Sequence, residues 1–172
     1  MKISIKTAHI ENNLILRASS TIRNNNKSGS ASIFYIAFFS ILSLTFTVLA
    51  LNFMIAFNHA AVFAKADLLA KSYADAATTQ FMAYDSKCEM LLECEPDASK
   101  KSYEYANKVL ERLLKTYHLE KGDYLIDASD EIELDKVLKF KSVIYKRIET
   151  GFSKDPLQFI GTTYYLKKIT RK

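Results

Sequence analysis

The chain has 172 residues, 49% of them apolar, with 24 Lys and Arg against 19 Asp and Glu. This length allows one compact domain and one further segment. The excess positive charge lies mostly before residue 31, where five basic residues face one acid, whereas nineteen basic and eighteen acidic residues follow residue 57. This distribution is typical of a flank beside an anionic membrane leaflet. It excludes the broad basic face of a nucleic-acid-binding protein, so we expect no nucleic acid as a partner.

The apolar residues are concentrated between residues 33 and 57, and no charged residue occurs between Lys27 and Lys65. This run exceeds the roughly 20 residues that a helix needs to cross a bilayer. It is longer, and starts later, than the apolar part of a cleavable signal peptide, although small residues around Ala64 leave cleavage open as an alternative. A buried core helix would show a polar face. We therefore predict a transmembrane helix at 32–57 that contacts the lipid bilayer.

The segment before this helix, residues 1–31, is predicted to lie in the cytoplasm. Its basic residues outnumber those just beyond the span, where Lys65 and Lys71 alternate with acids. The positive-inside rule therefore predicts a single-pass protein of the cell membrane with an extracytoplasmic C-terminal domain. The segment ends in a stretch rich in Ser, Asn and Gly, which favours exposed coil. A short amphipathic helix at 7–17 is an alternative for its first half.

Residues 58–84 are predicted to continue the helix beyond the membrane. This stretch has no Gly or Pro and is rich in Ala, the best helix former. Small residues allow close helix approach, so we expect its apolar face to pack on other membrane-anchored subunits. Asn52, inside the span, would bond another helix or meet water near the interface. The apolar residues at spacings of three and four form the packing stripe: Phe63, Ala66, Ala70, Tyr73, Ala74, Ala77 and Phe81.

Residues 85–172 are predicted to form an outer α+β domain with a second helix and a small antiparallel sheet. Helical spacing runs from Tyr103 to Tyr117, with Asp97 or Ser99 as the N-cap and Gly122 as the stop. The segments after Gly122 alternate or are rich in Thr, Tyr and Ile, as strands are.

One segment, residues 134–148, fits both a strand and a third helix. Its residues alternate in part, and its apolar positions also suit a helical stripe. We favour the strand.

Cys88 and Cys94 are predicted to form a disulfide, because an extracytoplasmic compartment permits one. On an unbroken helix the two residues would lie about 9 Å apart along the axis. That exceeds the Cα separation of about 4.4–6.8 Å that a disulfide tolerates. The bridge therefore requires the chain to turn between them, and two free thiols are the alternative.

The sequence shows no recognisable catalytic constellation. Its four glycines are too scattered for a phosphate-binding loop, its three histidines stand apart, and no zinc spacing is present. Acidic clusters at 89–97 and 127–135 could offer oxygen ligands to calcium, but the second lacks the calcium-loop pattern and a solvated face explains both. We predict no enzymatic activity, no cofactor, no metal and no small-molecule substrate.

Two short motifs carry a resemblance. Lys27-Ser28-Gly29-Ser30-Ala31-Ser32 leads into the span, and the helix beyond it bears Ala74-Asp75-Ala76-Ala77. Over residues 27–84 the chain resembles TadE/TadG-like proteins, the pseudopilins of tight-adherence (Flp-type) pilus systems. Prepilin processing after Gly29 would place Glu at the fifth mature position, whereas Phe34 stands there, so we expect an uncleaved anchor.

The resemblance implies a non-enzymatic, pilin-like or pseudopilin-like subunit of a surface pilus or secretion assembly that packs through its long helix. An accessory single-span subunit of a larger membrane complex is the alternative. In that case the outer domain docks on a partner.

Overall fold

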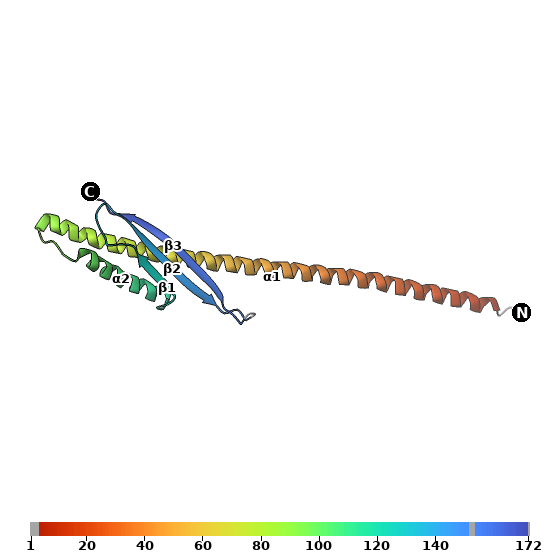
Figure 1. Ribbon diagram of the computed structural model, residues 1–172. Helices are drawn as coiled ribbons and strands as arrows, with labels where there is room; N and C mark the ends of the chain where they lie inside the picture. The colour runs from red at the N-terminus through yellow and green to blue at the C-terminus, as the bar shows by residue number, and fades with distance from the viewer. Residues whose placement is uncertain (1–3, 152–153, 172) are drawn as a thin grey trace. The chain divides into compact units, whose positions relative to one another are not determined.

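The computed structural model describes residues 4–151 and 154–171, with side chains from residue 32 onward. Its elements follow the predicted α+β order of two helices and then a sheet (Figure 1). The bounds are α1 Ser4–Leu91, α2 Ala98–Tyr117, β1 Tyr124–Ala128, β2 Val137–Ile148 and β3 Leu157–Lys168.

Helix α1 is longer at both ends than the sequence indicated. It begins at Ser4, so the prediction of coil before residue 31 is wrong. No proline occurs before Pro96, and the single Gly29 costs a helix only about 1 kcal/mol, too little to break a long one. At the other end the helix continues past residue 84 to Leu91, because nothing between those residues interrupts it.

The chain divides into two compact units, Met1–Phe53 and Met54–Lys172, and α1 takes part in both. We call the second unit the C-terminal domain. Within the first unit, every described side chain from residue 32 onward is exposed. This part of α1 is long and apolar enough to cross a membrane. We call residues 32–57 the anchor segment.

Helix α2 begins and ends by backbone geometry. Asp97 occupies the N-cap position, as predicted, but its side chain makes no capping bond. Ser99, the other predicted cap, accepts a 3.0 Å hydrogen bond from the Ile132 amide instead. The predicted stop at Gly122 is wrong, because the helix already ends when His118 turns left-handed at φ 52°. His118 N–H then reaches the carbonyl of Lys115, closing the last turn.

The three strands form an antiparallel meander in the order β1-β2-β3. Tyr124 pairs with Ile144 at one edge of β2, and Val137 pairs with Lys168 at the other. The strand interpretation of 134–148 is therefore confirmed for Val137–Ile148. Buried and exposed residues alternate along the first part of β2, where Leu138 and Phe140 point into the core.

The core of the C-terminal domain draws on both helices and the sheet. Tyr73 of α1 stacks on Tyr103 of α2 at 6.3 Å between ring centroids, and meets Phe140 of β2 edge-on at 6.1 Å. This cluster of three aromatic rings joins α1, α2 and β2, and the ring contacts stabilise the fold beyond the effect of burying apolar surface. Other members of the core come mainly from α1 and α2: Val62, Ala66, Leu69, Ala74, Ala77, Ala106, Leu110 and Leu114.

Candidate functional site

The anchor segment presents large apolar side chains on all sides. Phe34 and Phe53 are about three-quarters exposed, at 76% and 75%. Three of its polar side chains bond inside the helix: the Thr45 and Thr47 hydroxyls donate to carbonyls one turn earlier, and the Asn52 amide donates to Val48 O at 2.9 Å. Self-contained polar groups suit a helix in hydrocarbon. The prediction that Asn52 bonds another helix remains a prediction.

One side of the anchor segment carries a shallow groove of small residues. Ser40, Ser43 and Thr47 line it, together with Ile36 and flanking aromatic and leucine side chains. These positions are three or four apart and share one face of a helix. A neighbouring helix could approach this face more closely than the others.

The packing stripe lies inside the C-terminal domain, where the chain's own α2 and sheet cover it. Ala66, Ala70, Ala74 and Ala77 have no exposed surface, and Tyr73 is 6% exposed. Phe81 is half-buried against the same core. The prediction that these side chains face other subunits is therefore wrong for the folded chain. The close approach that their small size permits is made by elements of the same molecule.

Phe63 is the one member of the packing stripe whose side chain is exposed. It is 39% exposed and lies 4.8 Å from the His59 ring. Leu68 is exposed to the same extent, but it lies five residues further along the helix and points about 140° away from Phe63. These two side chains mark two separate parts of the α1 surface that the core leaves uncovered.

The predicted disulfide between Cys88 and Cys94 is confirmed, with a Cα–Cα distance of 4.2 Å. The chain turns between them as expected, because α1 ends at Leu91 and Leu92 takes a left-handed φ of 55°. A non-glycine residue there is strained, and such strain is often kept for function. Residues 88–94 are the distal loop.

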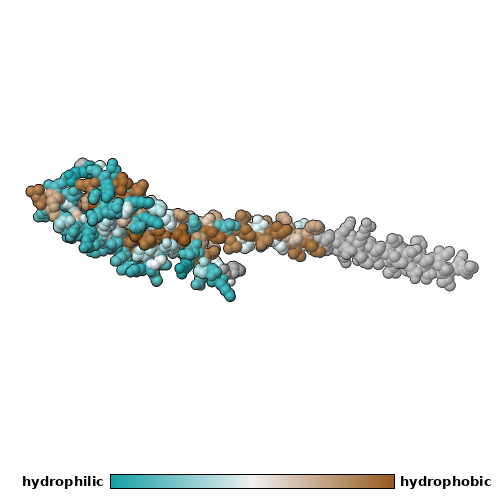
Figure 2. Space-filling model, in the orientation of Figure 1, coloured by the Kyte–Doolittle hydropathy of each residue, from teal (hydrophilic) through white to brown (hydrophobic). Residues whose placement is uncertain are grey.

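The distal loop exposes an unusual run of apolar side chains. Met90, Leu91 and Leu92 are 75%, 60% and 88% exposed. Figure 2 shows hydrophobic surface at this end of the C-terminal domain. Because the disulfide restrains the loop, these side chains stay exposed to solvent and do not pack against the domain. Apolar clusters of this kind are typical of protein contact sites.

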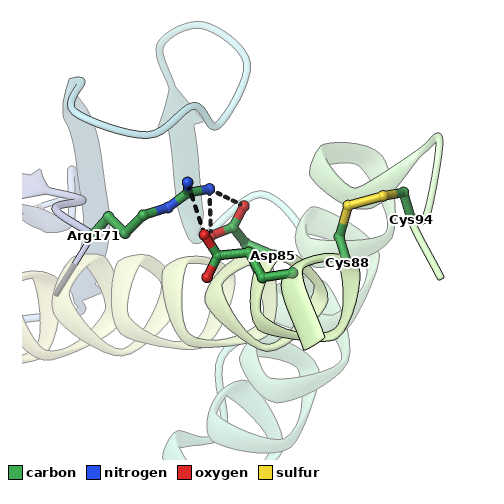
Figure 3. Close-up of a disulfide and its surroundings, with 5 residues drawn as sticks. Asp85, Cys88, Cys94 and Arg171 are labelled. Atoms are coloured by element: carbon green, nitrogen blue, oxygen red, sulfur yellow. Dashed lines mark hydrogen bonds and ion pairs between the residues drawn. A yellow bond between two sulfur atoms is a disulfide. The ribbon is translucent and has the colours of Figure 1, made fainter. Parts of the chain in front are cut away.

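Arg171 ties the end of the chain to α1 beside this loop (Figure 3). Its guanidinium donates to both carboxylate oxygens of Asp85, at 3.0 and 3.2 Å, and pairs with Glu89 at 2.8 Å. One nitrogen, Nη2, donates to both Asp85 oxygens while Nη1 reaches Glu89, and such charge-assisted hydrogen bonds are short and strong. The clamp fixes the last turns of α1 and, with them, the position of Cys88.

A series of polar contacts joins β3 to α1 along its length. The Thr163 hydroxyl reaches Asp67 at 3.4 Å, and Lys167 Nζ reaches Asp75 at 2.6 Å. This hydrogen bond raises the pKa of Lys167. Gly161 lies against Val62, since a Cβ there would meet the Val62 backbone oxygen at 2.8 Å. Strand and helix therefore run in the same direction, away from the Met54 end.

An open hollow of about 630 Å³ lies at the Met54 end of the C-terminal domain. Lys65, Lys121, Lys146 and Arg147 line it with positive charge, against the acids Glu120 and Asp123. Asp123 is engaged locally, because it accepts a hydrogen bond from the Glu120 amide at 3.0 Å. The hollow has a net positive lining and is open to solvent.

The titratable groups of the core serve packing. Burial raises the pKa of Tyr73, and burial, followed by the charges of nearby groups, raises the pKa of Tyr103 to about 12. The Tyr103 hydroxyl donates to Asp130 O at 2.7 Å, which fixes the loop before β2. Among the residues that the structure describes, no three His, Cys, Asp or Glu side chains are placed to hold a metal ion.

Comparison with models of protein families, with curated proteins and with solved structures found no match for this chain.

Sequence reasoning did not find the contacts between α1 and β3. Asp67 and Asp75 had been noted only as acids just beyond the span, and Asp85 lay outside the predicted helix. Their spacings of eight and ten residues on a helix cover about 12 and 15 Å. The intervals of four residues between Thr163, Lys167 and Arg171 cover about 13 Å in extended chain. The spacing of the three acids along the helix therefore nearly equals the spacing of their three partners along the extended chain. This match was the one signal in the sequence that could have predicted the contacts.

Proposed function

We propose that the protein is a non-enzymatic, single-span, pilin-like subunit of a surface pilus or secretion assembly. The observation that carries this proposal is the division of α1. Its anchor segment is apolar and uncovered throughout, whereas from Val62 onward the same helix is buried in a small α+β domain. A single helix thus combines a membrane anchor with the core of a folded domain.

This design suits a protein that assembles through its anchor. Because the packing stripe is covered within the chain, contacts between subunits fall to the anchor segment and to the uncovered parts of the α1 surface. The groove at Ser40, Ser43 and Thr47 offers the closest approach between helices. We propose that copies of the chain pack along this face, with the N-terminus in the cytoplasm and the C-terminal domain outside.

Cross-linking in native membranes tests the proposal. Thr47→Cys places a thiol on the grooved face, and Thr45→Cys places one on the opposite face. The pair is well matched, because both threonines bond a carbonyl one turn earlier. Cys88 and Cys94 are joined to each other and do not compete. We expect a thiol-reactive cross-linker to join copies through residue 47 several-fold more than through residue 45.

Other outcomes are equally informative. Equal cross-linking at both positions would contradict packing on the grooved face. If residue 47 is cross-linked only to a different polypeptide, assembly of like subunits is refuted.

The distal loop favours a second candidate, an accessory subunit of a larger membrane complex. Its exposed Met90, Leu91 and Leu92 would then contact a partner outside the membrane. The triple substitution of these residues by Ser should abolish capture of that partner while leaving cross-linking at residue 47 unchanged.

A further inference from the structure

The cations of the C-terminal domain are not all neutralised in the same way. Within the described residues, four of them pair with carboxylates, all away from the Met54 end: Lys101, Lys136, Lys167 and Arg171. Lys139 and Lys141 lie over the Tyr164 ring instead.

At the Met54 end, within the described residues, Lys121 and Arg147 contact no carboxylate, and Lys146 donates only to the Asn58 amide oxygen, at 3.3 Å. Lys65 lies over the Tyr117 ring. These four cations outnumber Glu120 and Asp123, the acids in the lining of the hollow, so the hollow keeps a net positive charge.

The contacts between β3 and α1 fix the height of this end along the helix. From Val62 to Asp75 the helix rises about 20 Å, and from Gly161 to Lys167 the strand covers about 20 Å. The strand and the helix therefore run side by side over this distance without a relative shift. Phe159, the strand partner of Lys146, then lies level with Asn58, in agreement with the observed bond.

The same scale places the first residue of β3 along the helix. Leu157 precedes Phe159 by two residues, about 7 Å, and therefore lies level with about residue 54. That is the last turn of the anchor segment. The headgroup layer of a bilayer is about 5–8 Å thick on each side. If the span ends at residue 57, Lys146, which is level with Asn58, lies in that layer, and Leu157 lies at its boundary with the hydrocarbon.

The side chains near these strand ends suit such a position. Arg147 is exposed, and so are Leu157 and Ile160, at 41% and 47%. Apolar side chains beside cations are typical of elements that lie in a membrane interface. Lys and Arg near an anionic lipid surface are attracted to it.

We propose that the adjoining ends of β2 and β3, at Arg147 and Leu157, and the basic hollow beside them bind the headgroups of acidic phospholipids. Lys146 and Arg147 contact the lipid phosphates, and Leu157 rests at the boundary with the acyl chains. This inference rests on the proposed membrane span. It adds a second membrane contact that limits rotation of the C-terminal domain about its helix.

Full-length protein in lipid nanodiscs provides the test. A fluorophore is attached to Gly151→Cys, where a Cβ meets nothing within 4 Å, and a nitroxide on the lipid headgroups quenches it. The discs contain either phosphatidylcholine alone or phosphatidylcholine with phosphatidylglycerol. We expect stronger quenching in the acidic discs, and a probe at Asn107→Cys on exposed α2 should be quenched little in both.

The contribution of the two cations is tested with a matched pair of double variants. Lys146→Gln with Arg147→Gln should lower the docking equilibrium by about fivefold for each cation lost and remove the difference between the discs. Lys139→Gln with Lys141→Gln removes the same charge from the other part of β2. This variant should keep the difference in quenching between the two kinds of disc.

Two results would overturn the inference. Equal, weak quenching at residues 151 and 107 in both discs would place these strand ends away from lipid. A difference that survives the Lys146 and Arg147 substitutions would remove their role. Failure of the chain to stay in the discs after alkaline washing would instead refute the span itself, so the two failures are distinguishable.

Discussion

The two parts of α1 differ in what covers them. Residues 32–57 carry Phe, Leu and Ile on every side and are exposed throughout. From Val62 to Thr78 the helix carries alanines on one face, and that face is fully buried. Large apolar residues around a whole helix indicate lipid, whereas a stripe of small ones indicates that a neighbouring element approaches closely.

The contrast teaches that a stripe of small residues predicts a close contact without saying which chain makes it. Ala70 and Ala74 were expected to meet other subunits, but α2 and the sheet occupy that space. Close packing on alanines therefore serves the fold here. Under the proposed function, assembly would use surfaces that the domain does not cover.

The largest expected effect comes from removing a large side chain from the covered part. Leu69→Ala empties a fully buried site and should lower the free energy of unfolding by about 2–5 kcal/mol. Leu68→Ala, at an exposed position of α1, should change it by less than about 0.5 kcal/mol. Urea unfolding of the detergent-solubilised protein, followed by circular dichroism, measures both. Equal effects would mean that the core does not cover α1 as described.

A smaller effect should follow from overfilling the same face. Ala70→Leu forces extra atoms against α2 or the sheet and should cost about 1–3 kcal/mol of stability. Ala83→Leu makes the same change at an exposed position of the same helix, where Leu is nearly as good a helix former as Ala. If Ala70→Leu leaves the thermal midpoint unchanged but abolishes cross-linking between copies, the stripe is an intermolecular surface after all.

The smallest effect is on pH dependence. An unfolded tyrosine loses its proton near its ordinary pKa of 10.0, whereas Tyr103 in the fold keeps it until about pH 12. The stabilisation from this raised pKa is therefore fully present below pH 10 and is lost as the pH rises to about 12. Tyr103→Phe should flatten the decline of unfolding free energy over that window. An unchanged slope would show that Tyr103 does not cause this decline. Retention of the protein in membranes should change neither with pH nor with the Tyr103→Phe substitution.

Much of the fold followed from local patterns. The apolar run, the order of helices and strands and the disulfide were all predictable, because periodicity and spacing determine them. The helix ends were not. Leu92 and His118 end α1 and α2 in left-handed conformations. Glycine is the usual residue there, so neither residue type marks a helix end in the sequence.

The candidate surfaces were harder to predict than the elements. The roles of Asp85 and Arg171 depend on contacts between residues 86 positions apart, which no local pattern encodes. The exposure of Met90 and Leu91 was equally hidden, because a sequence does not show what the core leaves uncovered.

The contacts between β3 and α1 also have a mechanical consequence. The strand and the helix run in the same direction and are joined at Asp67 and Asp75, and Arg171, just beyond the end of the strand, is joined to Asp85. A pull on the C-terminal end, with the helix held in a membrane, would slide β3 along α1. Such shear loads all these contacts together, whereas peeling would break them one at a time. A domain built in this way resists tension along the axis on which its anchor holds it.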